Sequence, residues 1–191
     1  MDYNFYAFLN RMKYINRWGL MRNTRVENVA EHSFQTALIA HALACIEKVV
    51  FKREVNPDKA TALAVYHETA EVITGDLPTP VKYFNDDIRG AYKKVEKYAE
   101  DKLFLGLPEE LREEIGACVR PDDCAEKKLV KYADKLAAYI KCIEEVTCGN
   151  KEFDNALKAT EKELRGYKSD SVNYFLENFV GAYYKNLDQL I

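Results

Sequence analysis

Residues 29–46 read VAEHSFQTALIAHALACI, and their apolar side chains recur at the spacing of a helix. Asn28 precedes this run and Glu31 stands three residues further on, which is the pattern of a capping box. We therefore expect a helix that is opened by Asn28 and runs to about Val50. The same spacing recurs along most of the chain, while strand-like alternation of β-branched residues is almost absent, so the sequence predicts an all-α fold.

The remaining helices can be placed from the run outward. A helix that starts at Asn56-Pro57-Asp58 is expected to end near Gly75, because Gly75-Asp76-Leu77-Pro78-Thr79-Pro80 contains two prolines two positions apart and must be a loop. Further helices are expected at residues 3–16, 85–106, 108–118, 126–148, 150–167 and 171–190. With no repeat and no flexible linker, we expect one domain over residues 1–191, a helical bundle of about seven to nine helices.

Composition restricts the class of function. The chain has 191 residues, of which 48% are hydrophobic, and a net charge of only −3, which argues against a protein that binds a nucleic-acid polymer. The first residues, MDYNFYAFLNRMK, lack the basic start and long apolar run of a signal peptide, and no apolar run reaches about 18 residues, so we expect no membrane association. Five cysteines without a CxxC pair are interpreted as reduced thiols of a cytoplasmic protein.

Two histidines interrupt the apolar run of residues 29–46. His32 and His41 are nine residues apart, which places them on opposite faces of a helix, so they cannot both point at one site. His41 lies among alanine and leucine and is interpreted as an ordinary structural histidine. His32, near the helix start, is better placed to reach a functional site.

A second polar group follows in ALAVYHETAEVITG, residues 62–75. His67 and Glu71 are four residues apart and Glu68 and Glu71 three apart, so on a helix all three would cluster near its C-terminal end. A solvated polar stripe would explain them, but a histidine beside a carboxylate also offers mixed ligands for a divalent ion.

Asp134 is the third departure from the apolar pattern. It lies on the helix face of Val130, Ala137 and Ala138, where a lone carboxylate would be costly to bury. A salt bridge to lysine or arginine is one explanation and a metal ion is the other. The metal interpretation gives a set of two nitrogen and two oxygen ligands from three helices: His32, His67, Glu68 and Asp134.

These residues resemble the signature of HD-domain metal phosphohydrolases, and the chain is most similar to the YfbR-type 5'-deoxynucleotidases of bacteria. Three stretches carry the likeness, INRWGLMRNTRVENVAEHS (15–33), YHETAEVITGDLPTPVKYFN (66–85) and VKYADKLAAYIKCIEE (130–145), and it extends over essentially the whole chain. The chain departs from the family in one ligand, because its doublet is His67-Glu68 where the family has His-Asp. Glutamate keeps the charge but is longer by one methylene.

The resemblance implies a metal-dependent 5'-deoxynucleotidase that hydrolyses deoxyribonucleoside 5'-monophosphates. It implies that these four residues bind the metal. Their nitrogen and oxygen donors would accommodate one divalent ion (Mn, Co, Fe or Zn), and our own hypothesis is that Asp134 also orients the attacking water. Arg17 would orient the phosphate and Trp18 would press on the sugar where a ribose 2'-hydroxyl would lie. Glu71 is our candidate proton donor to the leaving oxygen, since burial beside Glu68 would raise its pKa. The sugar side of the pocket would be lined by Asp76, Leu77, Pro78 and Thr79.

Two alternatives stay open at this point. One is another HD phosphohydrolase that acts on a nucleotide phosphodiester or a dinucleoside polyphosphate. The other is a nucleotide-binding protein that is catalytically impaired by the change to Glu68. The resemblance and the aromatic-rich C-terminal segment also suggest a homodimer, for which the candidate surface residues are Tyr174, Phe175, Phe179, Tyr183 and Tyr184.

Overall fold

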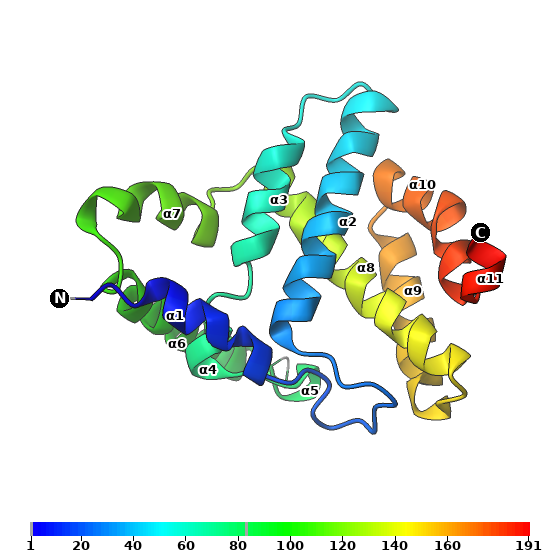
Figure 1. Ribbon diagram of the computed structural model, residues 1–191, viewed down its shortest axis with the longest axis horizontal. Coiled ribbons are helices and arrows are strands. Elements are labelled where there is room, and N and C mark those ends of the chain that lie inside the picture. The colour runs from blue at the N-terminus through cyan, green and yellow to red at the C-terminus, as the bar shows by residue number, and fades with distance from the viewer. Residues whose placement is uncertain (1, 83) are drawn as a thin grey trace.

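Two long helices, α2 (Val29–Val49) and α8 (Ala125–Thr147), pack against each other at the centre of the molecule, and α3 (Pro57–Tyr66) packs against both (Figure 1). The structure is a computed structural model that describes residues 2–82 and 84–191. The other α-helices are α1 (Phe5–Leu9), α4 (Glu71–Thr74), α5 (Thr79–Lys82), α6 (Asp86–Phe104), α7 (Arg112–Val119), α9 (Asp154–Gly166), α10 (Asp170–Asn178) and α11 (Leu187–Leu190). Short 3-10 helices are η1 (Asn10–Tyr14), η2 (Glu109–Leu111), η3 (Lys151–Phe153) and η4 (Val180–Tyr184).

The main hydrophobic core fills the space between α2, α3 and α8. Leu43, Leu136 and Ile140 are among its fully buried side chains, and α9 and α10 cover it on the C-terminal side. A smaller core joins α1 to α6, where Phe5 packs with Leu103. The long central helices therefore provide a rigid frame on which the loops near their ends are held.

The all-α bundle expected from the sequence is confirmed. The described residues form no β-strand, and their β-type pairing is limited to an isolated bridge between Asn16 and Asn28. The capping box at Asn28 and Glu31 is also as expected. In addition, no helix among the described residues is both long and apolar enough to cross a membrane. The extension of one domain over residues 1–191 stays a prediction.

The helix predicted from Asn56 to near Gly75 is interrupted. Its regular part ends at Tyr66, residues 67–70 form turns, and α4 begins at Glu71. The expectation that His67 and Glu71 lie on one continuous helix face is therefore wrong. Residues with helical spacing can still leave the helix when their side chains bond to the backbone, as His67 Nδ1 does to the carbonyl oxygen of Ala64.

Other boundaries differ in a similar way. The predicted loop 75–80 is a loop only to Pro78, because Pro80 is in the first turn of α5, where a missing N–H has no cost. The predicted helix at 3–16 is divided into α1 and η1. The helix predicted at 171–190 is divided into α10, η4 and α11, with Lys185 in an extended conformation between the last two.

Candidate active site

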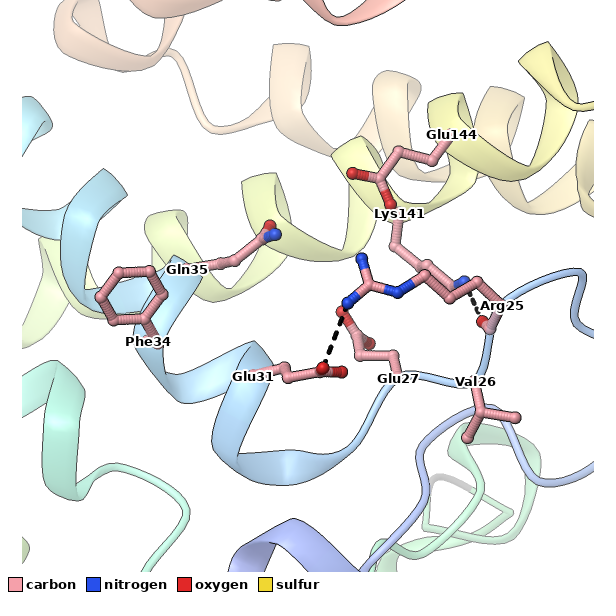
Figure 2. Close-up of a pocket in the computed structure, with 8 residues that line it drawn as sticks. All are labelled: Arg25, Val26, Glu27, Glu31, Phe34, Gln35, Lys141 and Glu144. Carbon is pink, nitrogen blue, oxygen red and sulfur yellow. Dashed lines mark hydrogen bonds and ion pairs between the residues drawn. The ribbon is translucent and has the colours of Figure 1, made fainter.

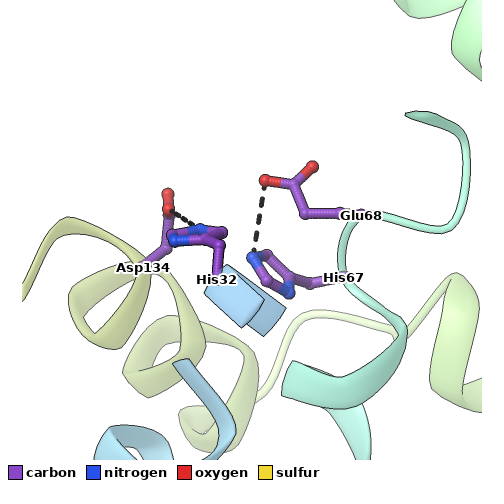
Figure 3. Close-up of side chains that lie close together, drawn as sticks. All are labelled: His32, His67, Glu68 and Asp134. Atoms are coloured by element: carbon purple, nitrogen blue, oxygen red, sulfur yellow. Dashed lines mark hydrogen bonds and ion pairs between the residues drawn. The ribbon is translucent and has the colours of Figure 1, made fainter. Parts of the chain in front are cut away.

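The four predicted ligands come together at one point (Figure 3). One ligand atom from each of them lies within 4.8 Å of all the others, and this is the group among the described residues that could hold a metal ion. His32 comes from the first turns of α2 and Asp134 from the middle of α8, while His67 and Glu68 come from the turn after α3. His41, in contrast, is exposed on α2 and is no part of the group.

The ring of His67 is oriented for metal binding. Its Nδ1 is 2.6 Å from the carbonyl oxygen of Ala64, and because a carbonyl can only accept, Nδ1 carries the proton. The lone pair of a neutral ring is then on Nε2, which is buried without a hydrogen-bond partner and lies 3.5 Å from Oε1 of Glu68. Fixing one ring nitrogen on a backbone carbonyl in this way is typical of histidine ligands.

His32 and Asp134 form the other half of the group. The His32 side chain is fully buried, and its Nε2 is 2.9 Å from Oδ1 of Asp134. Burial acts to raise the pKa of Asp134, but the hydrogen bond from His32 and the charge of Arg17 outweigh it and hold the pKa below its ordinary value. The carboxylate is thus held as an anion, and its hydrogen-bond partner is a histidine where the sequence had left a lysine or arginine salt bridge open.

Glu68 reaches the group in spite of its extra methylene. Its Oε1 lies 3.5 Å from His67 Nε2 and 3.8 Å from Nη1 of Arg17. The donor set therefore fits a divalent cation: two imidazole nitrogens and two carboxylates, with a buried and unsatisfied nitrogen among them.

Glu71 lies next to this group at the start of α4. Glu71 is only 5% exposed, and its Oε2 is buried without a hydrogen-bond partner. Burial first, and then the negative charges of Glu68 and Asp76, raise the pKa of Glu71 to about 10. Burial and the neighbouring carboxylates thus favour the protonated form of Glu71, which is the form that a general acid needs.

Arg17 is the cation of the site. Burial acts to lower its pKa, but the surrounding carboxylates, Glu68 and Asp134 first, raise it, so the guanidinium remains charged. Its Nε donates to Oε2 of Glu27 at 3.1 Å, and the indole Nε1 of Trp18 donates to the same oxygen at 3.0 Å. The sequence analysis missed Glu27, because a carboxylate in a polar loop gives no pattern that distinguishes it from a solvated residue.

The loop after α4 borders the same site. The pKa of Asp76 is raised chiefly by burial; the charge of Arg17 acts to lower it and the charge of Glu68 to raise it. The loop is fixed to α6 by Tyr92, whose hydroxyl donates to the carbonyl oxygen of Gly75 at 3.3 Å. The predicted substrate contacts of this loop stay predictions; they concern Asp76, Leu77, Pro78 and Thr79.

Comparison with known proteins identifies the family of this chain. The sequence profile of the family described as 5'-deoxynucleotidase YfbR-like matches residues 4–183. A 5'-deoxynucleotidase of Enterobacter sp. strain 638 is 49% identical over 189 residues, which cover 98% of this chain and 95% of that protein. The 5'-deoxynucleotidase YfbR of Escherichia coli K12 is 49% identical over 191 residues, with the same two coverages of 98% and 95%.

Two solved structures share the fold. An HD-domain phosphohydrolase from Listeria innocua superposes with a TM-score of 0.82 at 23% identity, over 94% of this chain and 88% of that one. The cyanophage S-2L HD phosphohydrolase DatZ, bound to dA and one catalytic Zn²⁺ ion, gives a TM-score of 0.63 at 17% identity, over 92% and 95% of the two chains. At these identities the likeness establishes the fold only.

Proposed function

The chain belongs to the YfbR-like family, and from this membership we propose that it is a metal-dependent 5'-deoxynucleotidase that hydrolyses deoxyribonucleoside 5'-monophosphates to deoxynucleoside and phosphate. One observation carries the proposal: ligand atoms of His32, His67, Glu68 and Asp134 lie within 4.8 Å of one another. The guanidinium of Arg17, 3.8 Å from Glu68, and the buried carboxyl group of Glu71 lie beside this cluster. An anionic ester needs all three, namely a site that activates water, a cation for the phosphoryl oxygens, and a proton for the leaving oxygen.

We assign the metal to His32, His67, Glu68 and Asp134. When bound there, a divalent cation such as Mn, Co, Fe or Zn supplies Lewis-acid activation of water near neutral pH. The mixed nitrogen and oxygen donors support this range of ions. The DatZ structure, which is described as bound to one catalytic Zn²⁺ ion, supports zinc in particular.

The reaction needs two proton transfers that the chain itself performs, one to the leaving oxygen and one from the water. The oxygen of water forms a bond to phosphorus while the bond from phosphorus to the 5'-oxygen breaks. Arg17 binds and orients the phosphoryl oxygens with its forked N–H groups. Glu71 gives its proton to the departing 5'-oxygen, and the proton lost by the water returns the carboxyl group to its neutral state. Asp134 orients the water, and Trp18 excludes the 2'-hydroxyl of a ribonucleotide.

The experiment that tests the proposal is phosphate release by metal-stripped protein from paired deoxy- and ribonucleoside 5'-monophosphates. Mn²⁺, Co²⁺, Mg²⁺ and Zn²⁺ are added back separately, and protein stripped and left without metal is the control. Release from the deoxynucleotides alone is expected with at least one of these metals. Release from phosphodiesters or dinucleoside polyphosphates instead would favour another HD phosphohydrolase.

A second candidate function rests on Glu68, which differs from the aspartate of the family pattern. If the longer side chain prevents turnover, the protein binds deoxynucleotides without hydrolysing them. Retained nucleotide binding with no phosphate release under any of the four metals would identify this case.

A homodimer also remains a proposal. Of the aromatic residues named for this surface, Phe175 is buried in the main core and so cannot contribute to it. Phe179, Tyr183 and Tyr184 are partly exposed. Light scattering on purified protein would give the mass of the assembly, and a mass of one chain would contradict the dimer. A cytoplasmic location remains a proposal as well, and the five free cysteines are consistent with the reduced thiols expected there.

A further inference from the structure

Glu27 holds two neighbouring side chains of the site with a single oxygen atom. Its Oε2 accepts from Nε of Arg17 at 3.1 Å and from Nε1 of Trp18 at 3.0 Å. The Glu27 and Arg17 side chains are 10% and 12% exposed, so water competes little for these bonds. A hydrogen bond from a cation to a buried carboxylate is among the stronger ones in proteins, and its geometry is correspondingly well defined.

The backbone around Glu27 supports the same arrangement. The amide of Arg17 donates to the carbonyl oxygen of Glu27 at 2.9 Å, and the amide of Val29 donates to the carbonyl oxygen of Ile15 at 2.9 Å. The segments before and after the loop of residues 18–26 are therefore paired. Val29 begins α2, the helix that carries His32. The same helix therefore helps to position both Glu27 and His32, one of the proposed metal ligands.

Trp18 needs this support because its backbone is strained. Its φ of 58° lies in the left-handed region, which a residue with a Cβ atom rarely adopts. The indole ring lies against Phe153, with ring centroids 5.3 Å apart, and this contact fixes its apolar side. The bond to Glu27 fixes its polar edge, where an N–H removed from water needs an acceptor.

We propose that Glu27 is a positioning residue for sugar discrimination, since its one oxygen fixes the phosphate-orienting Arg17 and the sugar-facing Trp18 relative to each other. This inference rests on the proposed function, in which these two side chains bind the two halves of the nucleotide. Because both bonds end on one atom, a shift of either side chain moves the other. The distance between phosphate and sugar subsites is then set by Glu27, although Glu27 contacts neither the phosphate nor the sugar.

A cavity beside Glu27 provides a matched control. Glu27 lines a cavity of about 170 Å³ together with residues of the loop, of α2 and of α8 (Figure 2). Glu144 lines the same cavity from α8, so it offers a carboxylate in similar surroundings on a different element. The variant E144Q changes the charge of the cavity and leaves the atoms that hold Arg17 and Trp18 in place.

The test compares two changes of Glu27 that separate geometry from charge. E27Q removes the charge but keeps an oxygen at the same reach, with its amide nitrogen free to face the cavity. E27D keeps the charge but is shorter by one methylene, about 1.5 Å, and so cannot keep both bonds. We expect E27D to lower the ratio of kcat/KM for deoxy- over ribonucleotides by about tenfold, the effect of one such bond. E27Q should retain the ratio within about threefold, as should E144Q.

A spectroscopic measurement gives the same comparison without turnover. Trp18 is the single tryptophan of the chain, so its fluorescence reports on this site alone. E27D should shift the emission to longer wavelength and increase quenching by acrylamide, while E27Q and E144Q should resemble the unmodified protein. If the protein releases no phosphate from any nucleotide, the proposed function fails, and the fluorescence still tests the hold of Glu27 on Trp18.

The outcomes that would overturn the inference are specific. One is unchanged fluorescence and unchanged sugar selectivity in a folded E27D protein, with folding checked by circular dichroism. The other is the reverse order of the variants, in which E27D behaves normally and E27Q loses selectivity. That order would show that Glu27 acts through its charge and not by positioning.

Discussion

Replacing Lys141 by methionine should destabilise the protein by about 3 kcal/mol or more at neutral pH, because it leaves the carboxylate of Glu145 buried without its cation. The two residues follow one another on α8 four positions apart, and their side chains are only 4% and 1% exposed. Methionine preserves the length and the packing of the lysine stem, so the change removes the charge and little else.

The magnitude can be worked from the surroundings of Glu145. Burial acts to raise its pKa, but the hydrogen bond from Lys141, the amide and hydroxyl of Thr24, and the amide of Asn150 together lower it to about 2. Compared with its ordinary value of 4.5, this corresponds to about 3 kcal/mol in favour of the folded state for all of these donors together. K141M removes the largest of these contributions and in addition leaves the buried carboxylate without a cation. Measured costs of breaking buried ion pairs, about 3–5 kcal/mol, lie in the same range.

The sign of the pH dependence follows from the lowered pKa. Stability from the ionised carboxylate is fully present above the unfolded pKa, near 4.5, and is lost as the pH falls toward the folded pKa of about 2. Urea unfolding of the protein and of K141M at pH 7, 4 and 2.5 measures this difference directly. The difference should be largest at pH 7 and decrease through this window.

An exposed ion pair provides the control. Arg165 and Glu161 are also four positions apart on a helix, but their side chains are 57% and 39% exposed. E161Q should therefore change the stability by less than about 1 kcal/mol. A K141M protein that is as stable as E161Q at pH 7, or whose deficit stays the same at pH 2.5, would refute the reasoning.

Four further predictions concern the site and the core. E71Q should abolish phosphate release and leave the bound metal, measured by elemental analysis, unchanged; near-normal release would remove Glu71 from the role of proton donor. W18A should admit ribonucleotides, which paired kcat/KM values would show, and unchanged selectivity would contradict the steric role of the indole. E68D should change the metal affinity, measured by titration of stripped protein, since the carboxylate moves by about 1 Å; an identical affinity would show that Glu68 is no ligand. L136A should lower the free energy of unfolding by about 2–5 kcal/mol, because it opens a cavity in the main core; a loss under 1 kcal/mol in urea unfolding would contradict the packing.

The sequence predicted the helical frame well because the frame depends on local pattern. The capping box at Asn28 and the apolar spacing of residues 29–46 both concern residues three or four positions apart, and the structure confirms the helix they predict. The four metal-type ligands could also be found, because each is a polar side chain in an apolar environment. A polar residue among apolar neighbours can be recognised from the sequence even when the other ligands are distant in the chain.

The positions that the sequence could not predict depend on contacts between distant segments. The end of α3 at Tyr66 reflects the turn at His67, whose side chain bonds to the backbone, and helical spacing alone gives no sign of it. Glu27 is a similar case. It acts through Arg17 and Trp18, and the pairing of these segments depends on the loop between them, which is held to α8 through Thr24 and Glu145.

The interruption after Tyr66 also bears on the glutamate at the second position of the doublet, because it takes Glu68 out of the regular helix. On a continuous helix the directions of both side chains would be fixed, and an extra methylene would carry the carboxylate past the other ligands. Here Glu68 stands in a turn, so the direction of its side chain is not fixed by the helix that ends at Tyr66. Its Oε1 still lies within reach of both His67 and Arg17. The longer side chain and the turn are therefore consistent with one another, and shortening Glu68 without moving the turn should weaken the metal site instead of improving it.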